Sequence, residues 1–179
     1  MIDTGGSSAI GLLNSGDLLE DDAWLAGALS RWGIPPPGAL SEADRAALRE
    51  LRALLRRLAR AVVEHGTLPD AELAELNAVI RATPVRAELV TQRDGGYLLS
   101  LTPLADTWRE LAVRELAGAF ASMLRQSFPP RLKLCDNCGT AFWDGTRSRT
   151  RRWCDSRTCG NRVRVRRHRG QSGSSRRGS

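Results

Sequence analysis

The sequence predicts an α+β protein, with a mostly helical N-terminal domain that carries one small β-hairpin and a small cysteine-rich knot after it. Three observations support this prediction. Apolar residues recur at helical spacing through much of the first 130 residues. The stretch 85–101 partly alternates instead and has a Gly-Gly turn near its middle. All four cysteines of the chain lie between residues 135 and 159.

Two helices are predicted before residue 66. The first takes Asp17 as its N-cap and ends in the proline-rich segment 33–38. The second begins at the capping sequence Ser41 to Asp44 and ends at Gly66. Its apolar residues recur at spacings of three and four: Leu48, Leu51, Leu55, Leu58 and Val62. Its arginines are expected to form a solvated face rather than a binding surface: Arg49, Arg52, Arg56, Arg57 and Arg60.

The remainder of the helical domain contains the predicted hairpin. A shorter helix begins at Asp70 and precedes it. The strands 85–91 and 97–101 flank a tight turn that is rich in glycine. A long helix follows the hairpin, and the pair Pro129 and Pro130 separates this helix from the knot.

Charge divides the chain at the same boundary. Residues 131–179 carry 14 Lys and Arg against three Asp and Glu, a net charge of +11, whereas residues 1–130 carry 13 against 17, a net charge of −4. We therefore predict a helical domain over 1–130, a knot over 131–169 and a disordered Gly, Ser and Arg tail over 170–179. The apolar runs fall short of the ~18 residues that a membrane span needs.

The cysteine spacing, Cys135-x2-Cys138-x15-Cys154-x4-Cys159, predicts one structural zinc site. Gly139 directly after the first pair suits the tight knuckle that such a site needs. Four thiolates complete a tetrahedral shell and leave no position for water, so the site is structural rather than catalytic. Two disulfides are an alternative, but we expect no signal peptide and therefore reduced thiols. An iron–sulfur cluster or a redox-sensing zinc site is the minority alternative.

The basic knot points to phosphate groups, most simply those of nucleic acid. An acidic protein partner would fit the same charge. Asn161 and Arg162 could read base edges or could instead support the zinc site. The residues expected to contact nucleic acid are Arg147, Arg149, Arg151, Arg152, Arg157, Asn161, Arg162, Arg164, Arg166, Arg167 and Arg169.

Catalytic motifs are missing from the sequence. It has two histidines, and neither a His-Glu-x-x-His nor a Gly-x-Ser-x-Gly motif occurs. His65 lies at a predicted helix end and His168 among the arginines of the knot. We therefore expect that the protein is not an enzyme.

Several short motifs resemble the CGNR zinc-finger family. They are Phe142-x-Asp144, Arg152-Trp153-Cys154 and above all Cys159-Gly160-Asn161-Arg162, the tetrapeptide for which the family is named. Members carry an N-terminal α+β domain called ABATE. The stretch Leu12-Leu13-Asn14-Ser15 resembles the entry strand of that domain, with Gly11 near the usual acidic position and Ser15 in place of Thr. The resemblance implies a stress-induced transcriptional regulator of bacteria, chiefly actinobacteria.

The residues of the knot are compatible with a treble-clef-like zinc finger. We expect a knuckle, then a hairpin that pairs 140–143 with 151–153 around an Asp144-Gly145 turn, then a helix over 161–169. Asp155 or Ser156 would cap that helix.

Together these observations predict a cytoplasmic bacterial regulator that binds one Zn²⁺ per chain and, through the knot, duplex DNA. The N-terminal domain would form a homodimer or bind a small-molecule effector. Two other classes stay open, namely a protein-interaction module whose knot docks an acidic partner, and an RNA-binding protein.

Overall fold

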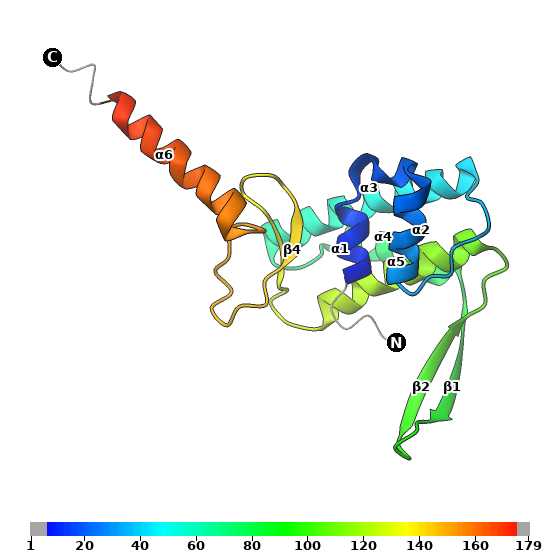
Figure 1. The fold of residues 1–179 in the computed structure, drawn as a ribbon. Coiled ribbons are helices and arrows are strands. Elements are labelled where there is room, and N and C mark those ends of the chain that lie inside the picture. Colours follow the sequence, from blue (N-terminus) through cyan, green and yellow to red (C-terminus); the bar gives the residue numbers. More distant parts are fainter. Residues whose placement is uncertain (1–6, 175–179) are drawn as a thin grey trace.

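The computed structural model describes residues 7–174. Figure 1 shows a helical body from which a long hairpin and the last helix project at opposite ends. The elements are α1 (Ser7–Leu13), the 3-10 helix η1 (Gly16–Glu20), α2 (Asp22–Arg31), α3 (Glu42–His65), α4 (Asp70–Ala82), β1 (Val85–Thr91), β2 (Tyr97–Pro103), α5 (Trp108–Arg125), β3 (Leu132–Leu134), β4 (Ala141–Trp143), the π-turn η2 (Ser156–Gly160) and α6 (Asn161–Ser174). Each sheet is an antiparallel pair, β1 with β2 and β3 with β4. The predicted α+β class is confirmed.

The core lies where α1, α3 and α5 meet, and α4 packs on α5. Leu12, Leu55 and Phe120 are fully buried there, as the helical periodicity predicts. Leu132 of β3 and Ala141 of β4 belong to the same core. The hairpin of the knot is therefore packed on the helical domain and continues its core.

The capping signals of α3 are confirmed. The Ser41 hydroxyl accepts a hydrogen bond from the Asp44 amide, and the Asp44 carboxylate accepts one from the Ser41 amide. Gly66 ends the helix at a φ of 76°, in the left-handed region that favours glycine.

The first predicted helix is in fact two elements, and Asp17 is not its cap. Asp17 lies inside η1, and Asp21 caps α2 by accepting a hydrogen bond from the Trp24 amide at 2.9 Å. Leu19 is fully buried whereas Leu18 is 44% exposed. A tight 3-10 turn places Leu19 in the core, which one continuous α-helix starting at Asp17 would not do.

The prediction that the α3 arginines form a solvated face is wrong in part. Arg56 donates to the carbonyl of Leu13 at 2.8 Å, and Arg52 donates to the carbonyl of Gly16. The Leu13 carbonyl is the last of α1, where no helical partner is available, and Gly16 opens η1. Arg57 is exposed as predicted. The arginines of α3 thus hold the first elements of the chain in place.

The predicted entry strand at 12–15 is also wrong, because Leu12 and Leu13 belong to α1. Gly11 lies in the same helix, against the indole of Trp32. A Cβ on Gly11 would come within 2.6 Å of that ring. Glycine at this position therefore makes room for Trp32, which gives a packing reason for the missing acidic residue.

Two predicted boundaries move, the end of the second strand of the hairpin and the start of the tail. Strand β2 continues to Pro103, and α5 begins at Trp108, after its N-cap Thr107. The tail predicted to be disordered from residue 170 is helical as far as Ser174, because extending a formed helix costs less than nucleating one. The predicted tail residues 175–179 lie outside the described residues.

Candidate metal centre and nucleic-acid interface

The first cysteine pair lies in the turn between β3 and β4. The amide of Cys135 donates to the Thr140 carbonyl at 2.9 Å, and the amide of Gly139 donates to the Cys135 carbonyl at 2.8 Å. Gly139 has a φ of 70°, which an L-residue with a side chain rarely adopts. The sequence therefore forms the predicted knuckle.

The predicted pairing of 140–143 with 151–153 is wrong. Strand β4 pairs with β3, in a register that joins Lys133 to Phe142. The stretch 151–153 is irregular and reaches the knuckle through one backbone hydrogen bond, from the Asp136 amide to the Arg152 carbonyl at 3.0 Å. Strand β3, directly before Cys135, is too short to be recognised from the sequence, but it supplies the edge with which β4 pairs.

The four cysteines are free thiols whose Sγ atoms lie within 4.8 Å of one another. The Cys138 and Cys154 sulfurs are 3.7 Å apart, Cys154 and Cys159 3.7 Å, and Cys138 and Cys159 3.6 Å. Sulfurs around a tetrahedral zinc ion with bonds of ~2.3 Å stand ~3.8 Å apart. The donor set and its spacing thus fit one zinc ion.

Polar and apolar groups surround the sulfurs. The Asn137 amide donates to Cys159 Sγ at 3.4 Å, and the Thr140 hydroxyl lies 3.1 Å from Cys138 Sγ. Phe142 and Trp153 pack against the cysteine cluster. Partners of this kind orient metal ligands and keep water away from them.

Gly160 of the Cys-Gly-Asn-Arg tetrapeptide is buried beside Trp153. A Cβ on Gly160 would lie 3.3 Å from the indole ring. The glycine thus permits the aromatic cover. The third aromatic residue, Trp143, packs on the helical core instead.

Hydrogen bonding and burial act against each other on the thiols. Burial raises the pKa of Cys135, but amide hydrogen bonds from Cys154, Asn137 and Cys138 outweigh it and lower the pKa to about 6. The Thr140 hydroxyl and amide lower the pKa of Cys138. Burial and the neighbouring thiols raise the pKa of Cys154 to about 12. A coordinating thiol is deprotonated outright, so zinc binding by this cluster releases protons.

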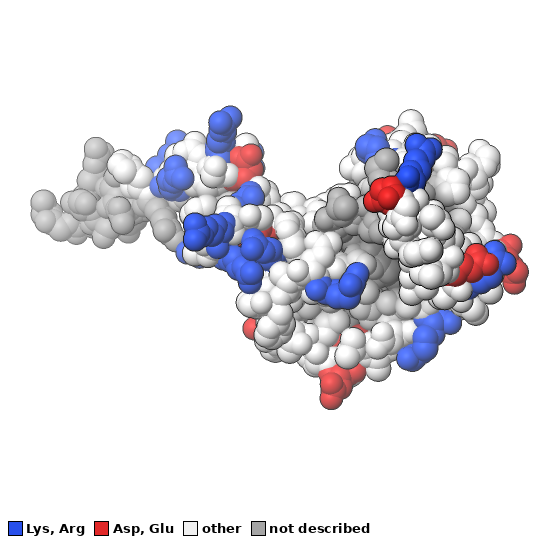
Figure 2. All heavy atoms as spheres, turned by 90° about the horizontal axis from the view of Figure 1, so that it is seen from below, with Lys and Arg blue, Asp and Glu red and all other residues white. Residues whose placement is uncertain are grey.

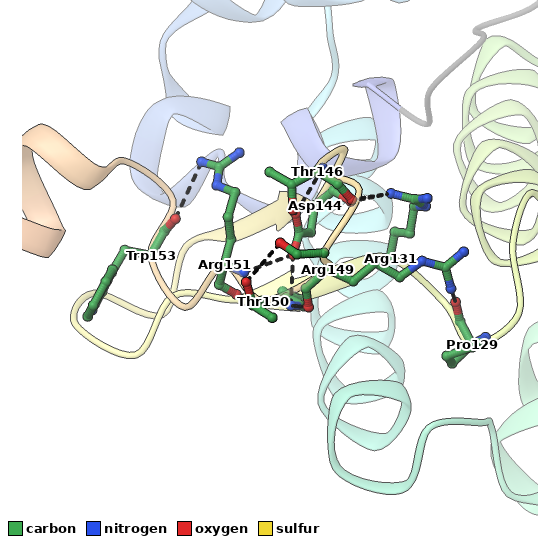
Figure 3. Close-up of polar contacts among 10 residues, drawn as sticks. Pro129, Arg131, Asp144, Thr146, Arg149, Thr150, Arg151 and Trp153 are labelled. Atoms are coloured by element: carbon green, nitrogen blue, oxygen red, sulfur yellow. Dashed lines mark hydrogen bonds and ion pairs between the residues drawn. The ribbon is translucent and has the colours of Figure 1, made fainter.

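The loop after β4 is wound around Asp144, whose side chain is fully buried (Figure 3). Its carboxylate accepts hydrogen bonds from Lys133 Nζ at 2.8 Å, from the Thr146 hydroxyl at 2.6 Å and from the Arg151 amide at 3.0 Å. Burial raises the pKa of Asp144, but these donors hold it well below its usual range. Lys133 also donates to the Arg151 carbonyl at 3.1 Å.

The sequence predicts Asp144 only as part of a turn and does not indicate that its carboxylate organises the loop. The available signal was the Phe142-x-Asp144 motif together with Lys133, which is the only lysine of the chain.

Three of the arginines predicted to contact nucleic acid also hold the knot together. Arg151 donates to the Cys154 carbonyl at 2.6 Å and lies over the Phe142 ring, 5.1 Å from its centroid. Arg152 forms an ion pair with Asp136 at 2.7 Å. Arg149 donates to the Pro129 carbonyl at 3.4 Å (Figure 3).

The other predicted contacts gather on α6 and the loops beside it. Asp155 caps the turn before α6, accepting from the amides of Arg157 and Thr158 at 2.6 and 2.8 Å. Figure 2 shows cations concentrated over the knot, whereas cations and acids mix over the helical body. The exposed members are Arg147, Arg157, Asn161, Arg162, Arg164, Arg166 and Arg169, and the Arg167 side chain lies outside the described part.

The loop beside α6 forms an open groove of about 430 Å³. Most of its side chains carry hydroxyl or guanidinium groups. The residues that line it are Thr146, Ser148, Thr150, Arg151, Arg152, Trp153 and Ser156. Donors of this kind suit phosphate oxygens.

Comparison with known families finds two matches. Residues 131–171 match the CGNR zinc finger. Residues 6–127 match the ABATE family, described as "Putative stress-induced transcription regulator". No curated protein matches the sequence. Together with the four clustered sulfurs, these matches point to a single zinc ion. Within residues 7–174, no helix has both the length and the apolar character to cross a membrane.

Proposed function

The chain belongs to the ABATE family of transcription regulators and ends in a CGNR zinc finger, and on this basis we propose that it is a zinc-dependent regulator that binds duplex DNA. The observation that carries the proposal is a run of exposed arginines on α6, namely Arg162, Arg164, Arg166 and Arg169. Within residues 7–174, none of these four side chains forms an ion pair with an acidic residue.

Helix α6 has the shape that reading a duplex requires. It projects from the body with most of its surface free (Figure 1). An α-helix is ~10–12 Å across with its side chains, and the major groove of B-DNA is ~12 Å wide. The spacing of Arg162, Arg166 and Arg169 places them on one face. Like charges at this spacing repel each other in a free helix, and a polyanion removes that cost.

The groove beside α6 supplies phosphate contacts in this proposal. Hydroxyls of Ser148 and Thr150, 2.9 Å apart, and the guanidinium of Arg152 line it. Arg147 is exposed on the same loop. Contacts of this kind fix orientation, while Arg162 and Asn161 at the base of α6 are the residues offered to base edges. Asn161 is exposed, and the amide that bonds a zinc-site sulfur is that of Asn137.

We further propose that the protein acts in the bacterial cytoplasm and has no enzymatic activity of its own. Its N-terminal domain would bring two copies together or bind an effector. An acidic protein that docks on the knot is the second candidate, because the same cations would serve it. RNA is the third.

Fluorescence anisotropy over a salt series tests the DNA proposal. Each neutralised phosphate should contribute a log–log slope of about −0.9. The variant R164A/R166A/R167A should bind every duplex more weakly and with a flatter slope. R162A should lose roughly 1–3 kcal/mol of discrimination between target and random duplexes. R81A/R93A/R125A removes the same charge from exposed positions of the helical domain and should bind as the wild type does.

Several results would contradict the proposal. Wild-type protein that binds no duplex at low salt would reject it, and so would a triple α6 variant that binds like the wild type. Either result would favour the acidic protein partner. Preference for single-stranded or hairpin RNA over duplex DNA would favour the third candidate.

A further inference from the structure

The β1–β2 hairpin presents one face that is entirely uncharged. The register pairs Val85 with Pro103 and Thr91 with Tyr97, so alternate residues of both strands share a face. This hairpin face consists of Val85, Ala87, Leu89, Thr91, Tyr97, Leu99, Leu101 and Pro103. The opposite face carries the charges Arg86 and Glu88 beside Ser100 and Thr102.

The hairpin face is open to solvent. Leu89 is 69% exposed, Tyr97 70%, Leu99 60% and Leu101 54%. The hairpin extends away from the body (Figure 1), and the extensive contacts of each strand are with the other strand. An isolated two-stranded hairpin is marginally stable in water, and side chains of this kind usually cover a core. The face therefore has the properties of an interface without its partner.

Charge indicates which partner fits. The hairpin carries Arg86, Glu88, Arg93 and Asp94, a net charge of zero in a chain of +7. The basic knot lies at the other end of the molecule (Figure 1). Two copies that meet through their hairpins would keep their knots apart, whereas a contact between the knots would bring like charges together.

We propose that the hairpin face binds the same face of a second copy of this chain, across a two-fold axis. A self-complementary apolar face needs no second surface, since each copy offers the other the same rows of side chains. Stacked strand pairs of this kind lie ~10 Å apart. Seven residues per strand in a two-stranded ribbon give a footprint of roughly 230 Å² per copy. This is smaller than the ~800 Å² of a standard interface, so we expect a dimer in the micromolar range.

Sedimentation equilibrium of the full chain tests the proposal at about 0.5 M salt, which screens contacts bridged by nucleic acid and leaves apolar contacts in place. The wild type should be mainly dimeric at about 100 µM. Leu101→Glu should weaken the dimer by roughly a hundredfold, because it buries a charge in the apolar interface. The matched control is Thr102→Glu, which places the same charge one residue along, on the opposite face and across from Arg86.

A second pair of variants separates the interface from hairpin stability. L89S/L99S and V90S/L98S each remove one cross-strand apolar pair, from the hairpin face and from the opposite face respectively. The first should weaken the dimer strongly and the second by no more than about threefold. The proposal is overturned if the wild type is a monomer at about 100 µM, which would leave the face to a different protein, or if the two variants of either pair weaken the dimer equally.

Discussion

Asp144 shows how one buried charge organises a loop without regular structure. The side chain is fully buried, and Lys133, Thr146 and Arg151 supply its hydrogen bonds. A buried carboxylate is tolerated only when it is paired and bonded in this way. The arginines of the proposed DNA interface follow directly in the chain, so their positions depend on this carboxylate.

At the residue scale, Asp144→Asn should destabilise the knot by about 3 kcal/mol, because Lys133 then lacks its counter-charge. Thermal unfolding at neutral pH, read by tryptophan fluorescence, measures the effect. The folded-state pKa of Asp144 lies below its ordinary value, so this stabilisation is present at neutral pH and is lost only as the pH falls into the acidic range. Asp136→Asn is the control. Its ion pair with Arg152 is exposed, and its loss should cost less than about 0.5 kcal/mol. Equal effects of the two changes would refute the role of Asp144.

Between elements, α1 and β4 are joined through one side chain. The Asn14 amide donates to the Ala141 carbonyl and its oxygen accepts from the Ala141 amide, both at 2.8 Å. These bonds reproduce the pattern of a neighbouring strand. They fix the free edge of β4, and with it the zinc knuckle, to the helical domain.

We expect Asn14→Ala to cost about 1–2 kcal/mol, since two hydrogen bonds are lost at a partly buried site. Amide hydrogen exchange should accelerate at Ala141 and in the knuckle. Asn14→Asp keeps the shape and the acceptor but lacks the donor, so its effect on Ala141 should be intermediate. The link would be unimportant if Ala141 exchanged at the wild-type rate in Asn14→Ala.

At the scale of the whole molecule, part of the knot is packed into the helical core. Leu132 and Ala141 are buried against the helices, whereas Cys135, Cys159 and Phe142 form a second small cluster around the sulfurs. The second cluster is too small to fold by itself, so we expect metal binding to supply its folding energy. When the metal is removed, the loss of structure should therefore extend to the helices that contact β3 and β4.

Purified protein should contain one zinc per chain, and Cys138→Ala should lose it. Hydrogen exchange should then show loss of protection from 135 to 160 and partial loss in α1 and α3. Helix α4, which packs on α5, should keep its protection. Ser148→Ala alters the same knot without touching a sulfur and should retain zinc. Iron in the purified protein, or unchanged protection in Cys138→Ala, would contradict this account.

Local patterns of the sequence determined most of the elements and the metal centre. The three-and-four spacing of Leu48 to Val62 predicts α3, because one face of a helix must be buried. The cysteine spacing predicts the knuckle and the cluster of sulfurs, because a Cys-x2-Cys pair closes within one turn. Signals of this kind lie within a few residues and can be recognised without the fold.

The tertiary structure decided every feature whose partners are distant in the chain. Asn14 and Ala141 are 127 positions apart, and Arg56 meets the Leu13 carbonyl across 43. Whether an arginine faces water or a free carbonyl depends on which helix end lies opposite it. The pairing of β4 also depends on the fold, because β4 pairs with the nearby edge of β3 and not with 151–153. Such choices are made by the packing of the whole chain, because hydrogen bonds form with whichever group the core brings within reach.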